Sequence, residues 1–317
     1  MSIDGKASST TRTKTGSQRS ITDELESGQI IAAFGRQYLV RLDNGSEIPC
    51  LTRGKKSEVA CGDTVEIKRT ADASAVNGAG EQGVIERIAP RRSLLHRSDA
   101  YREKLIAANV TQIIVVVAAE PSFSDELLAR CLVAAFDQKL EVLIVLNKCD
   151  LPAVAAARKR LAVYTSIGYR VLELSAKQDI SSLRPFLTGH TSVLVGQSGM
   201  GKSTLINALL PGAQAATREI STVLDSGKHT TTHARLYRID ADSGLIDCPG
   251  VQAFGLHHLS FGGIEQGFVE FAQYLGKCRF HDCHHAHEPG CALRNAVKEG
   301  KIDARRLELF QQISAHR

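Results

Sequence analysis

The stretch Gly196–Thr204, Gly-Gln-Ser-Gly-Met-Gly-Lys-Ser-Thr, constrains the fold of this chain more than any other. It follows the apolar run Ser192–Val195 and precedes the apolar run Leu205–Leu210, so it predicts a strand, a glycine-rich turn and a helix. In such a loop the backbone N–H groups surround one anion, Lys202 reaches the β- and γ-phosphates, and Ser203 ligates Mg²⁺. A chance Gly/Ser-rich turn is the alternative, but it explains neither the spacing nor the flanking runs.

Composition narrows the class of protein without naming a partner. Apolar residues make up 43% and charged residues 23% of the 317 positions, as in an ordinary globular chain long enough for two or three domains. No apolar run approaches the roughly 18–20 residues of a membrane span, and residues 1–20 lack the apolar segment of a secretory signal. We therefore expect a cytoplasmic protein with no membrane partner. A net charge of +5 permits a nucleic-acid partner without requiring one.

The N-terminal part predicts a tail followed by a small barrel. Residues 1–24 are polar and basic without periodicity, which favours a disordered tail. Over 25–90 about five short β-rich runs are separated by turn signals, and this is typical of an OB or SH3-like barrel. Such a barrel either binds oligonucleotides or is purely structural, since few aromatic residues are available for base stacking. A cationic face would come from Arg53, Lys55, Lys56, Lys68 and Arg69.

An α/β pattern follows a segment that reads as a linker. We predict the linker over 91–110, where the basic run Arg91–Arg97 either contacts phosphates or is merely solvated. Over 111–255 buried strands alternate with helices, which predicts a parallel sheet. The strands are expected at Gln112–Ala118, Glu141–Leu146, Arg170–Leu174, Ser192–Val195, about 233–239 and Gly244–Asp247, and the helices at Ser124–Phe136 and Ala153–Tyr164.

The motif Asn147-Lys148-Cys149-Asp150 identifies the base. It ends a buried strand, where a doubly wound sheet places its ligand contacts. The Asp150 carboxylate can accept both N1–H and the 2-amino group of guanine, whereas adenine would leave it unpaired at a cost of about 1–3 kcal/mol. We expect Asn147 to meet the other edge of the purine and Lys148 to lie over its ring. The backbone of Ser175-Ala176, at the next strand end, can donate to the guanine O6 atom.

Three further residues are predicted to act at the γ-phosphate. Asp247 would hold Mg²⁺ through water, and Gly250 would place its amide at the phosphate. In the loop 226–233 we expect Thr231, or else its neighbour Thr230, to complete the Mg²⁺ shell. Val251 stands where Ras-like proteins place a water-orienting glutamine, so another group must position the water. Our hypothesis is His229, and the alternative is a surface histidine without a catalytic role.

The predicted site can now be stated as a whole. We expect catalytic roles for Lys202, Thr231 and, as a hypothesis, His229, and Mg²⁺ ligation by Ser203 and Thr231. The residues expected to bind GTP or GDP are Asn147, Lys148, Cys149, Asp150, Ser175, Ala176, Gly196, Gln197, Ser198, Gly199, Met200, Gly201, Lys202, Ser203, Thr204, Asp247 and Gly250. In a conventional GTPase the base-binding motifs come last along the chain, but here they come first. This order indicates a circular permutation, which preserves packing when it falls at an exposed loop.

A cluster of cysteines and histidines follows the nucleotide motifs. Cys278, Cys283, His285 and Cys291 form a Cys₃His set suited to a closed tetrahedral site for structural Zn²⁺. His281, His284 and His287 are rival fourth ligands. Because 256–317 is short, this helical segment could hardly build a core without the ion. Flanking helices are expected over about Gly262–Leu275 and Asn295–Ile313.

The barrel, the permuted motif order, the Lys-His-Thr-Thr-Thr loop and the Cys-x4-Cys-x-His-x5-Cys module together resemble the RsgA family of bacterial small-subunit assembly GTPases. The resemblance spans about 28–300. It implies an OB-fold barrel, a circularly permuted P-loop GTPase domain and a C-terminal zinc-binding domain. It also implies binding to the 30S ribosomal subunit and 16S rRNA, ribosome-stimulated hydrolysis and a role in late rRNA maturation, and it supports His285 as the fourth zinc ligand. Lys228 and Cys248 depart from the residues expected there, arginine and threonine.

We expect a monomer. The alternative function is a GTP-dependent signalling switch or scaffold with a protein partner.

Overall fold

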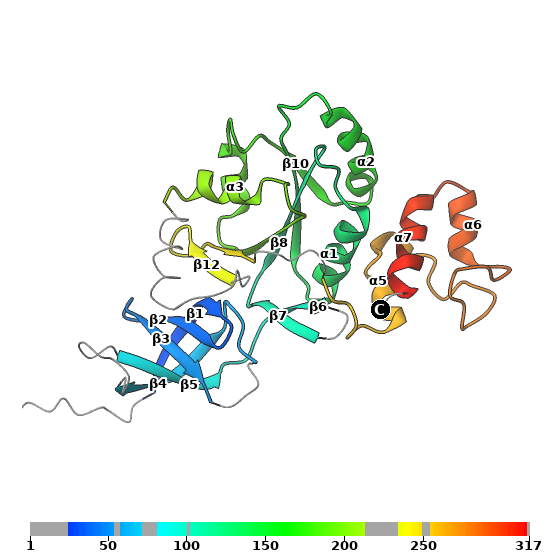
Figure 1. Ribbon diagram of the computed structural model, residues 1–317. Helices are drawn as coiled ribbons and strands as arrows, with labels where there is room; N and C mark the ends of the chain where they lie inside the picture. Colours follow the sequence, from blue (N-terminus) through cyan, green and yellow to red (C-terminus); the bar gives the residue numbers. More distant parts are fainter. Residues whose placement is uncertain are drawn as a thin grey trace, which may run out of the picture.

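The computed structural model describes residues 25–53, 58–71, 81–99, 102–212, 234–248 and 254–315. The predicted tail, Lys55 and Lys56 of the barrel, and His229, Thr231 and Gly250 of the nucleotide site lie outside these residues. Three groups of elements follow one another in the sequence: a small barrel, a central sheet flanked by helices, and a helical C-terminal module (Figure 1). Among the described residues, no helix is both long and apolar enough to traverse a lipid bilayer.

Five strands close the predicted N-terminal barrel. They are β1 (Glu26–Phe34), β2 (Gln37–Leu42), β3 (Glu47–Thr52), β4 (Thr64–Ala71) and β5 (Glu81–Ile88). Their order is β1-β2-β3-β5-β4, and β4 pairs back to β1, so the sheet closes on itself. Alternate side chains, among them Ile30, Val40, Val65 and Ile67, point inward and fill the interior. The expected OB-fold barrel is therefore confirmed.

The central sheet has the doubly wound arrangement that the sequence predicts. Its strands are β8 (Gln112–Ala118), β9 (Glu141–Asn147), β10 (Arg170–Glu173), β11 (Thr191–Val195), β12 (Ala234–Arg238) and β13 (Gly244–Asp247). They lie in the order β10-β9-β8-β11-β13-β12, parallel except for β12. All seven residues of β8 are buried, because helices cover both faces of the sheet. The carboxyl ends of β8, β9, β10, β11 and β13 consequently meet at one edge.

Helices α1 (Asp125–Asp137) and α2 (Val154–Ser166) lie on one side of this sheet, and α3 (Lys202–Leu209) lies on the other (Figure 1). The predicted cap of α1 is present, because the Ser124 hydroxyl accepts a hydrogen bond from the backbone N–H of Leu127 at 3.2 Å. Asp125 and Glu126 in the first turn also favour a helix start there. A short 3₁₀ helix, η1 (Ser181–Phe186), leads to β11.

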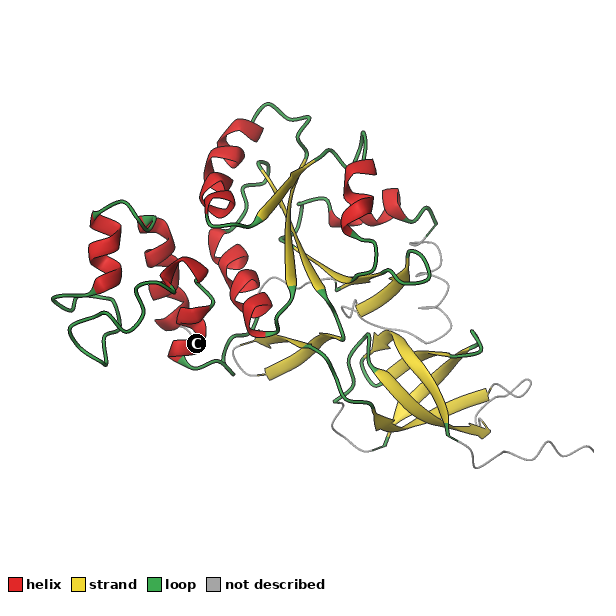
Figure 2. Cartoon of the chain, turned by 180° about the vertical axis from the view of Figure 1, so that it is seen from behind, coloured by secondary structure: helices red, strands yellow, loops and turns green. Residues whose placement is uncertain are grey.

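The barrel and the central sheet share hydrogen bonds. Strand β1 pairs antiparallel with β12, with Ala32 opposite Arg235 and Ala33 opposite Ala234. The two sheets are thereby joined into one of eleven strands, and the junction lies between the barrel and the helical layers (Figure 2). At a second contact Gly62 has φ +94°, and a Cβ atom there would lie 2.3 Å from the carbonyl oxygen of Ala108. Only glycine permits this approach.

The segment predicted as a linker contains a β-hairpin, β6 (Leu94–Asp99) and β7 (Arg102–Ala108). Apolar side chains anchor it, because Leu95 and Ile106 are buried in the main core. The backbone N–H of Ala108 donates to the carbonyl of Cys61 in the barrel at 2.8 Å. On its other strand, the carbonyl of His96 accepts from the N–H of Gly255 at 3.1 Å. The segment predicted as a linker thus carries a packed β-hairpin between the barrel and the rest of the chain.

The C-terminal module contains α5 (Phe261–Gln266), η2 (Val269–Phe271), α6 (Ala292–Lys298) and α7 (Ala304–Ala315). The two longer helical stretches predicted here are each broken. Gly267 caps α5 and fits closely against α1, where a Cβ atom would lie 2.9 Å from Val133. Gly300 follows α6 with φ +69°, a conformation that ends helices and that glycine adopts without strain. Helices α5 and α7 both pack on α1.

Candidate nucleotide site and metal centre

The glycine-rich loop has the backbone conformation of a phosphate cradle. The backbone φ values of Gly196, Gly199 and Gly201 are +151°, +82° and +93°, which residues other than glycine rarely adopt. At Gly196 a Cβ atom would also lie 2.3 Å from the carbonyl oxygen of Val116 on the neighbouring strand. The loop ends directly at the first turn of α3, whose free N–H groups favour an anion.

Lys202 and Asp247 place opposite charges beside this loop. The Lys202 ammonium donates to the carbonyls of Gly196 and Gln197 at 2.5 and 2.8 Å, so the lysine lies along its own loop. Burial lowers the pKa of Lys202, partly opposed by the negative charge of Asp247. Burial likewise raises the pKa of Asp247, partly opposed by Lys202. A phosphate group and a divalent cation placed here would favour the charged form of each side chain.

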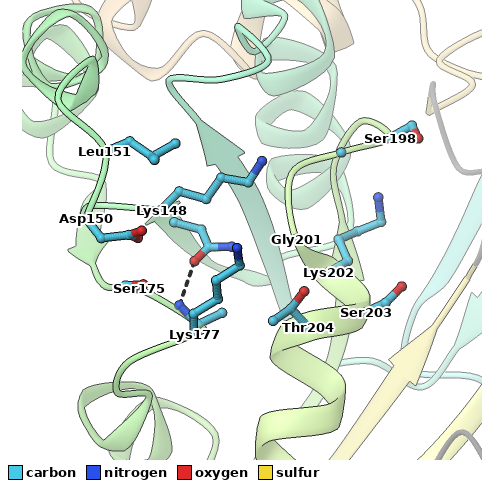
Figure 3. Close-up of a pocket in the computed structure, with 13 residues that line it drawn as sticks. Lys148, Asp150, Leu151, Ser175, Lys177, Ser198, Gly201, Lys202, Ser203 and Thr204 are labelled. Atoms are coloured by element: carbon cyan, nitrogen blue, oxygen red, sulfur yellow. Dashed lines mark hydrogen bonds between the residues drawn. The ribbon is translucent and has the colours of Figure 1, made fainter.

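A pocket of about 470 Å³ opens at the carboxyl edge of the sheet (Figure 3). It brings together residues from the ends of β9, β10 and β11 that are far apart in the sequence. Its lining comprises Asn147, Lys148, Asp150, Leu151, Ser175, Ala176, Lys177, Ser198, Gly199, Gly201, Lys202, Ser203 and Thr204. Most of the predicted nucleotide residues in the described part of the chain are therefore neighbours. Leu151 and Lys177 were not predicted as site residues, although each directly follows a predicted motif residue.

The residues predicted to recognise the base line the wall of the pocket that follows β9 and β10. Asp150 and Lys177 are exposed on it (Figure 3). Lys148 has φ +61°, and its ammonium donates to the carbonyl of Glu120 at 2.7 Å, so its alkyl chain is held along the pocket. The thiol of Cys149 instead faces the carbonyl of Leu146 at 3.2 Å, and Cys149 does not line the pocket.

Asn147 lines the pocket and also makes contacts behind it that its motif did not predict. Only 2% of the residue is exposed. Its amide NH₂ donates to the carbonyl of Met200 at 2.9 Å, and its amide oxygen accepts from the N–H of Ala176 at 2.9 Å. Asn147 thus ties the phosphate loop to the segment after β10, which positions the two halves of the pocket relative to each other. This bracing role adds to the predicted contact with the purine edge, because the second hydrogen of the amide NH₂ is not used by these bonds.

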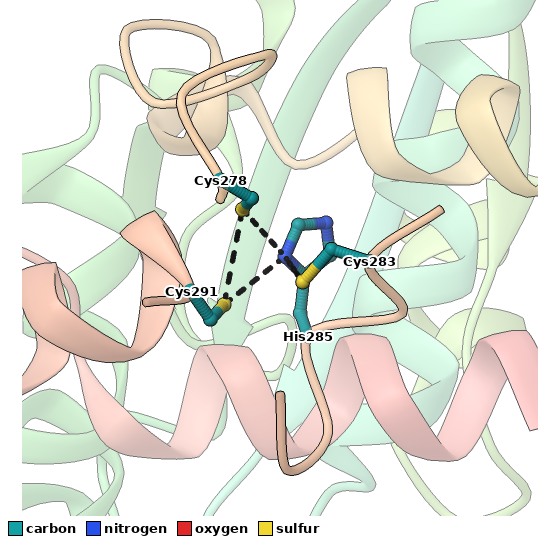
Figure 4. Close-up of side chains that lie close together, drawn as sticks. All are labelled: Cys278, Cys283, His285 and Cys291. Carbon is teal, nitrogen blue, oxygen red and sulfur yellow. Dashed lines mark hydrogen bonds between the residues drawn. The ribbon is translucent and has the colours of Figure 1, made fainter. Parts of the chain in front are cut away.

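The four predicted metal ligands lie together in the C-terminal module (Figure 4). One ligand atom from each of Cys278, Cys283, His285 and Cys291 lies within 4.8 Å of the others. The Nδ1 atom of His285 faces the three sulfur atoms at 3.5, 3.6 and 3.2 Å. The rival histidines at 281, 284 and 287 are not in this group.

The donor set fits Zn²⁺. Three thiolates and one imidazole in a closed cluster are typical of structural zinc, which binds sulfur and nitrogen tetrahedrally. Burial raises the pKa of Cys283 and of Cys291, so these thiols resist ionisation by themselves. A divalent cation would reverse this preference because it stabilises the thiolate. Zinc would therefore stabilise the module as well as fill the cluster.

The predicted cationic face of the barrel is weaker than the sequence indicated. Arg53 forms an ion pair with Glu86 at 2.7 Å, and Arg69 pairs with Glu26 at 2.5 Å. Each of these two arginines therefore has an acidic partner that offsets its charge. The partners come from strands distant in sequence, so the sequence alone did not indicate them.

Comparisons with known proteins agree with this geometry. A family model described as RsgA GTPase matches residues 88–257. A protein named "Small ribosomal subunit biogenesis GTPase RsgA" from Nitrosospira multiformis is 54% identical over 93% of this chain and 92% of its own length. A relative with the same name from Nitrosomonas europaea is 49% identical over 94% of each chain.

Solved structures show the same fold. YjeQ from Thermotoga maritima superposes with a TM-score of 0.68 at 28% identity, covering 92% of this chain and 98% of that one. YloQ, described as a circularly permuted GTPase, superposes with a TM-score of 0.63 at 25% identity, covering 95% and 97%. The overall fold is thus shared with both proteins, and the second is also described as circularly permuted. The chain belongs to the RsgA GTPase family, and it is a circularly permuted enzyme that hydrolyses GTP with Mg²⁺.

Proposed function

We propose that this GTPase binds the 30S ribosomal subunit and couples GTP hydrolysis to late assembly of that subunit and maturation of 16S rRNA. The observation that carries the proposal is 54% identity over 93% of the chain to a small ribosomal subunit biogenesis GTPase. The arrangement of the chain supports it, because a barrel and a metal module flank the GTPase domain and extend the surface available to a large RNA. We propose a monomer acting in the cytoplasm, where bacterial ribosomes are assembled.

The proposed division of the chain follows from this role. Residues 1–24 are a tail, 25–90 the barrel, 91–110 the connection that contains the hairpin, 111–255 the GTPase domain and 256–317 the zinc module. Within the module Cys278, Cys283, His285 and Cys291 hold one structural Zn²⁺. The barrel and the module contact RNA, and the GTPase domain reports whether GTP or GDP is bound.

In the GTPase domain we assign the following roles to the predicted residues. Asp150 accepts from guanine, while the loop amides and Lys202 bind the phosphates. Ser203 and Thr231 ligate Mg²⁺, Asp247 holds it through water, and Gly250 contacts the γ-phosphate. His229 positions the water, since Val251 cannot.

Asp150→Asn tests base recognition: we expect GTP affinity to fall by about 10²–10⁴-fold, because the amide cannot accept from both guanine donors.

Turnover of GTP with and without purified 30S subunits tests the proposed function. We expect strong stimulation by 30S, co-sedimentation in a non-hydrolysable GTP analogue, and a steep loss of binding with added salt, as phosphate contacts require. Turnover that 30S leaves unchanged, together with no co-sedimentation, would support the rival function, a signalling switch with a protein partner.

His229→Ala tests the residue proposed to position the water. The 30S-stimulated rate should fall while GTP affinity is retained, and an unchanged rate would exclude His229 from this role.

A further inference from the structure

The imidazole of His285 has a defined partner on each of its two ring nitrogens. Nδ1 faces the three cysteine sulfurs, whereas Nε2 lies 2.5 Å from a carboxylate oxygen of Glu265 on α5. Both side chains are largely enclosed, with 5% of the His285 and 17% of the Glu265 side chain exposed. Solvent therefore does not compete strongly for this contact, and the carboxylate is part of the surroundings of the metal centre.

We propose that Glu265 is the positioning residue of the zinc site and that it selects Nδ1 of His285 as the metal-binding atom. The inference rests on the zinc site proposed above. An ionised carboxylate only accepts hydrogen bonds, so Nε2 must carry the hydrogen and donate it to Glu265. In a neutral imidazole the lone pair is then on Nδ1, where the three thiolates leave the fourth corner of a tetrahedron. A carboxylate behind a metal-bound histidine also increases its basicity.

Other contacts hold the ring but cannot choose between its nitrogens. His285 has φ +60°, and its carbonyl accepts from the side-chain amide of Gln311 on α7 at 2.6 Å. The ring of Phe261 lies nearly parallel to the imidazole, at an angle of 17° and a centroid distance of 6.3 Å. These neighbours fix the backbone and the ring plane. Selection of the coordinating atom therefore falls to Glu265.

The same glutamate links the metal centre to the GTPase domain. Glu265 lies just before Gly267, which packs against Val133 of α1 in the GTPase domain. The next residue, Phe268, contacts the guanidinium of Arg306 within the C-terminal module. A bound ion held by His285 would consequently restrain the end of α5 that lies against α1.

Zinc affinity of the full-length protein tests the assignment. The protein is stripped of metal under reducing conditions and titrated with Zn²⁺ in competition with a chromogenic chelator. For Glu265→Ala we expect a loss of about 10–100-fold in affinity. Glu265→Gln should lose less, because its amide oxygen still accepts from Nε2. Glu299→Ala is the matched control, since Glu299 lies in the same module but pairs only with Lys301 at the surface among the described residues, and it should bind zinc as the wild type does.

A spectroscopic readout separates positioning from a general effect on folding. With ¹⁵N-labelled histidine in the zinc-loaded protein, we expect wild-type His285 to be coordinated through Nδ1 and protonated at Nε2. Glu265→Ala should show a mixture of linkages or faster exchange, and circular dichroism of Glu265→Gln confirms that the helices are retained. Coordination through Nε2, or zinc affinity of Glu265→Ala within twofold of wild type, would overturn the assignment alone. A wild-type protein that binds no zinc would overturn the proposed site as well.

Discussion

Removal of one member of the buried pair Arg306–Glu270 should destabilise the C-terminal module far more than removal of both. Arg306 on α7 donates from Nε and Nη2 to the two Glu270 oxygens at 2.5 and 3.2 Å, and only 2% and 8% of these side chains are exposed. Breaking such a pair leaves one charge unpaired in the interior and costs about 3–5 kcal/mol. Glu270→Leu and Arg306→Met should each lose that amount.

The double variant Arg306→Met/Glu270→Leu should recover most of this loss. Apolar side chains of similar volume often replace a buried ion pair at little net cost. The loss of stability that remains comes from the missing contacts of the guanidinium with two aromatic rings. The Arg306 guanidinium carbon lies 4.4 Å from the ring centroid of Phe268 and 5.3 Å from that of Tyr164 on α2. Losing these cation–π contacts accounts for about 1–2 kcal/mol in the double variant.

Native-state hydrogen exchange suits the measurement, because a chain with several domains need not unfold in one transition. Opening free energies of α7 and α1 amides are compared among the four proteins with zinc in excess. Arg305→Met is the matched control, since Arg305 is half exposed and its pairs with Asp125 and Glu308 are worth at most about 1 kcal/mol. If the double variant loses the sum of the two single losses, the pair does not act as a unit and the reasoning fails.

Three further outcomes follow from the site. Gly196→Ala should abolish measurable GTP binding while the barrel stays folded, because the Cβ atom of the alanine would lie 2.3 Å from the carbonyl oxygen of Val116. Titration with nucleotide checks this, and wild-type affinity would contradict the cradle geometry. Chelation of zinc should leave GTP affinity unchanged but increase hydrogen exchange over 276–303, and unchanged exchange there would argue against a structural ion. Glu288→Gln should destabilise the loop that contains His285, because the carboxylate accepts from the N–H groups of 284, 286 and 287. Hydrogen bonds from its own backbone N–H and then from those of His284, His287 and Ala286 lower the pKa of Glu288 to about 2. The difference from wild type in unfolding experiments should therefore be full above the ordinary pKa of 4.5 and vanish as the pH falls toward 2, and a pH-independent difference would refute this origin.

The features that the sequence predicted well have local signals. Gly196–Thr204 and Asp150 follow buried apolar runs, and the ends of parallel strands must meet at one edge whatever the order of the motifs along the chain. The cysteine spacing indicated the three sulfur ligands of the metal cluster, whereas His285 was one of four candidate histidines and was supported by the family resemblance. In each case the residue types and their separations carry the information.

The features that were missed depend on partners distant in sequence. Glu26 and Glu86 neutralise arginines of the barrel across strand pairings that no local pattern specifies. Asn147 bonds to Met200 and Ala176, so its role became visible only when three loops were brought together. Glu265 lies far enough from His285 along the chain that a contact between them has no sequence signature. Spacing identifies ligands, whereas their supporting contacts require the folded chain.

The pairing of β1 with β12 has a consequence for experiments that remove the barrel. Without β1, β12 would become the outermost strand of the GTPase sheet and would present unpaired N–H and C=O groups at 234 and 235. Uncovered strands of this kind recruit other chains and promote aggregation. A truncation that begins after the barrel therefore changes two properties together, RNA contact and solubility. Point substitutions on the outer surface of the barrel, which leave this strand protected, are the cleaner way to separate recognition of the ribosome from integrity of the enzyme.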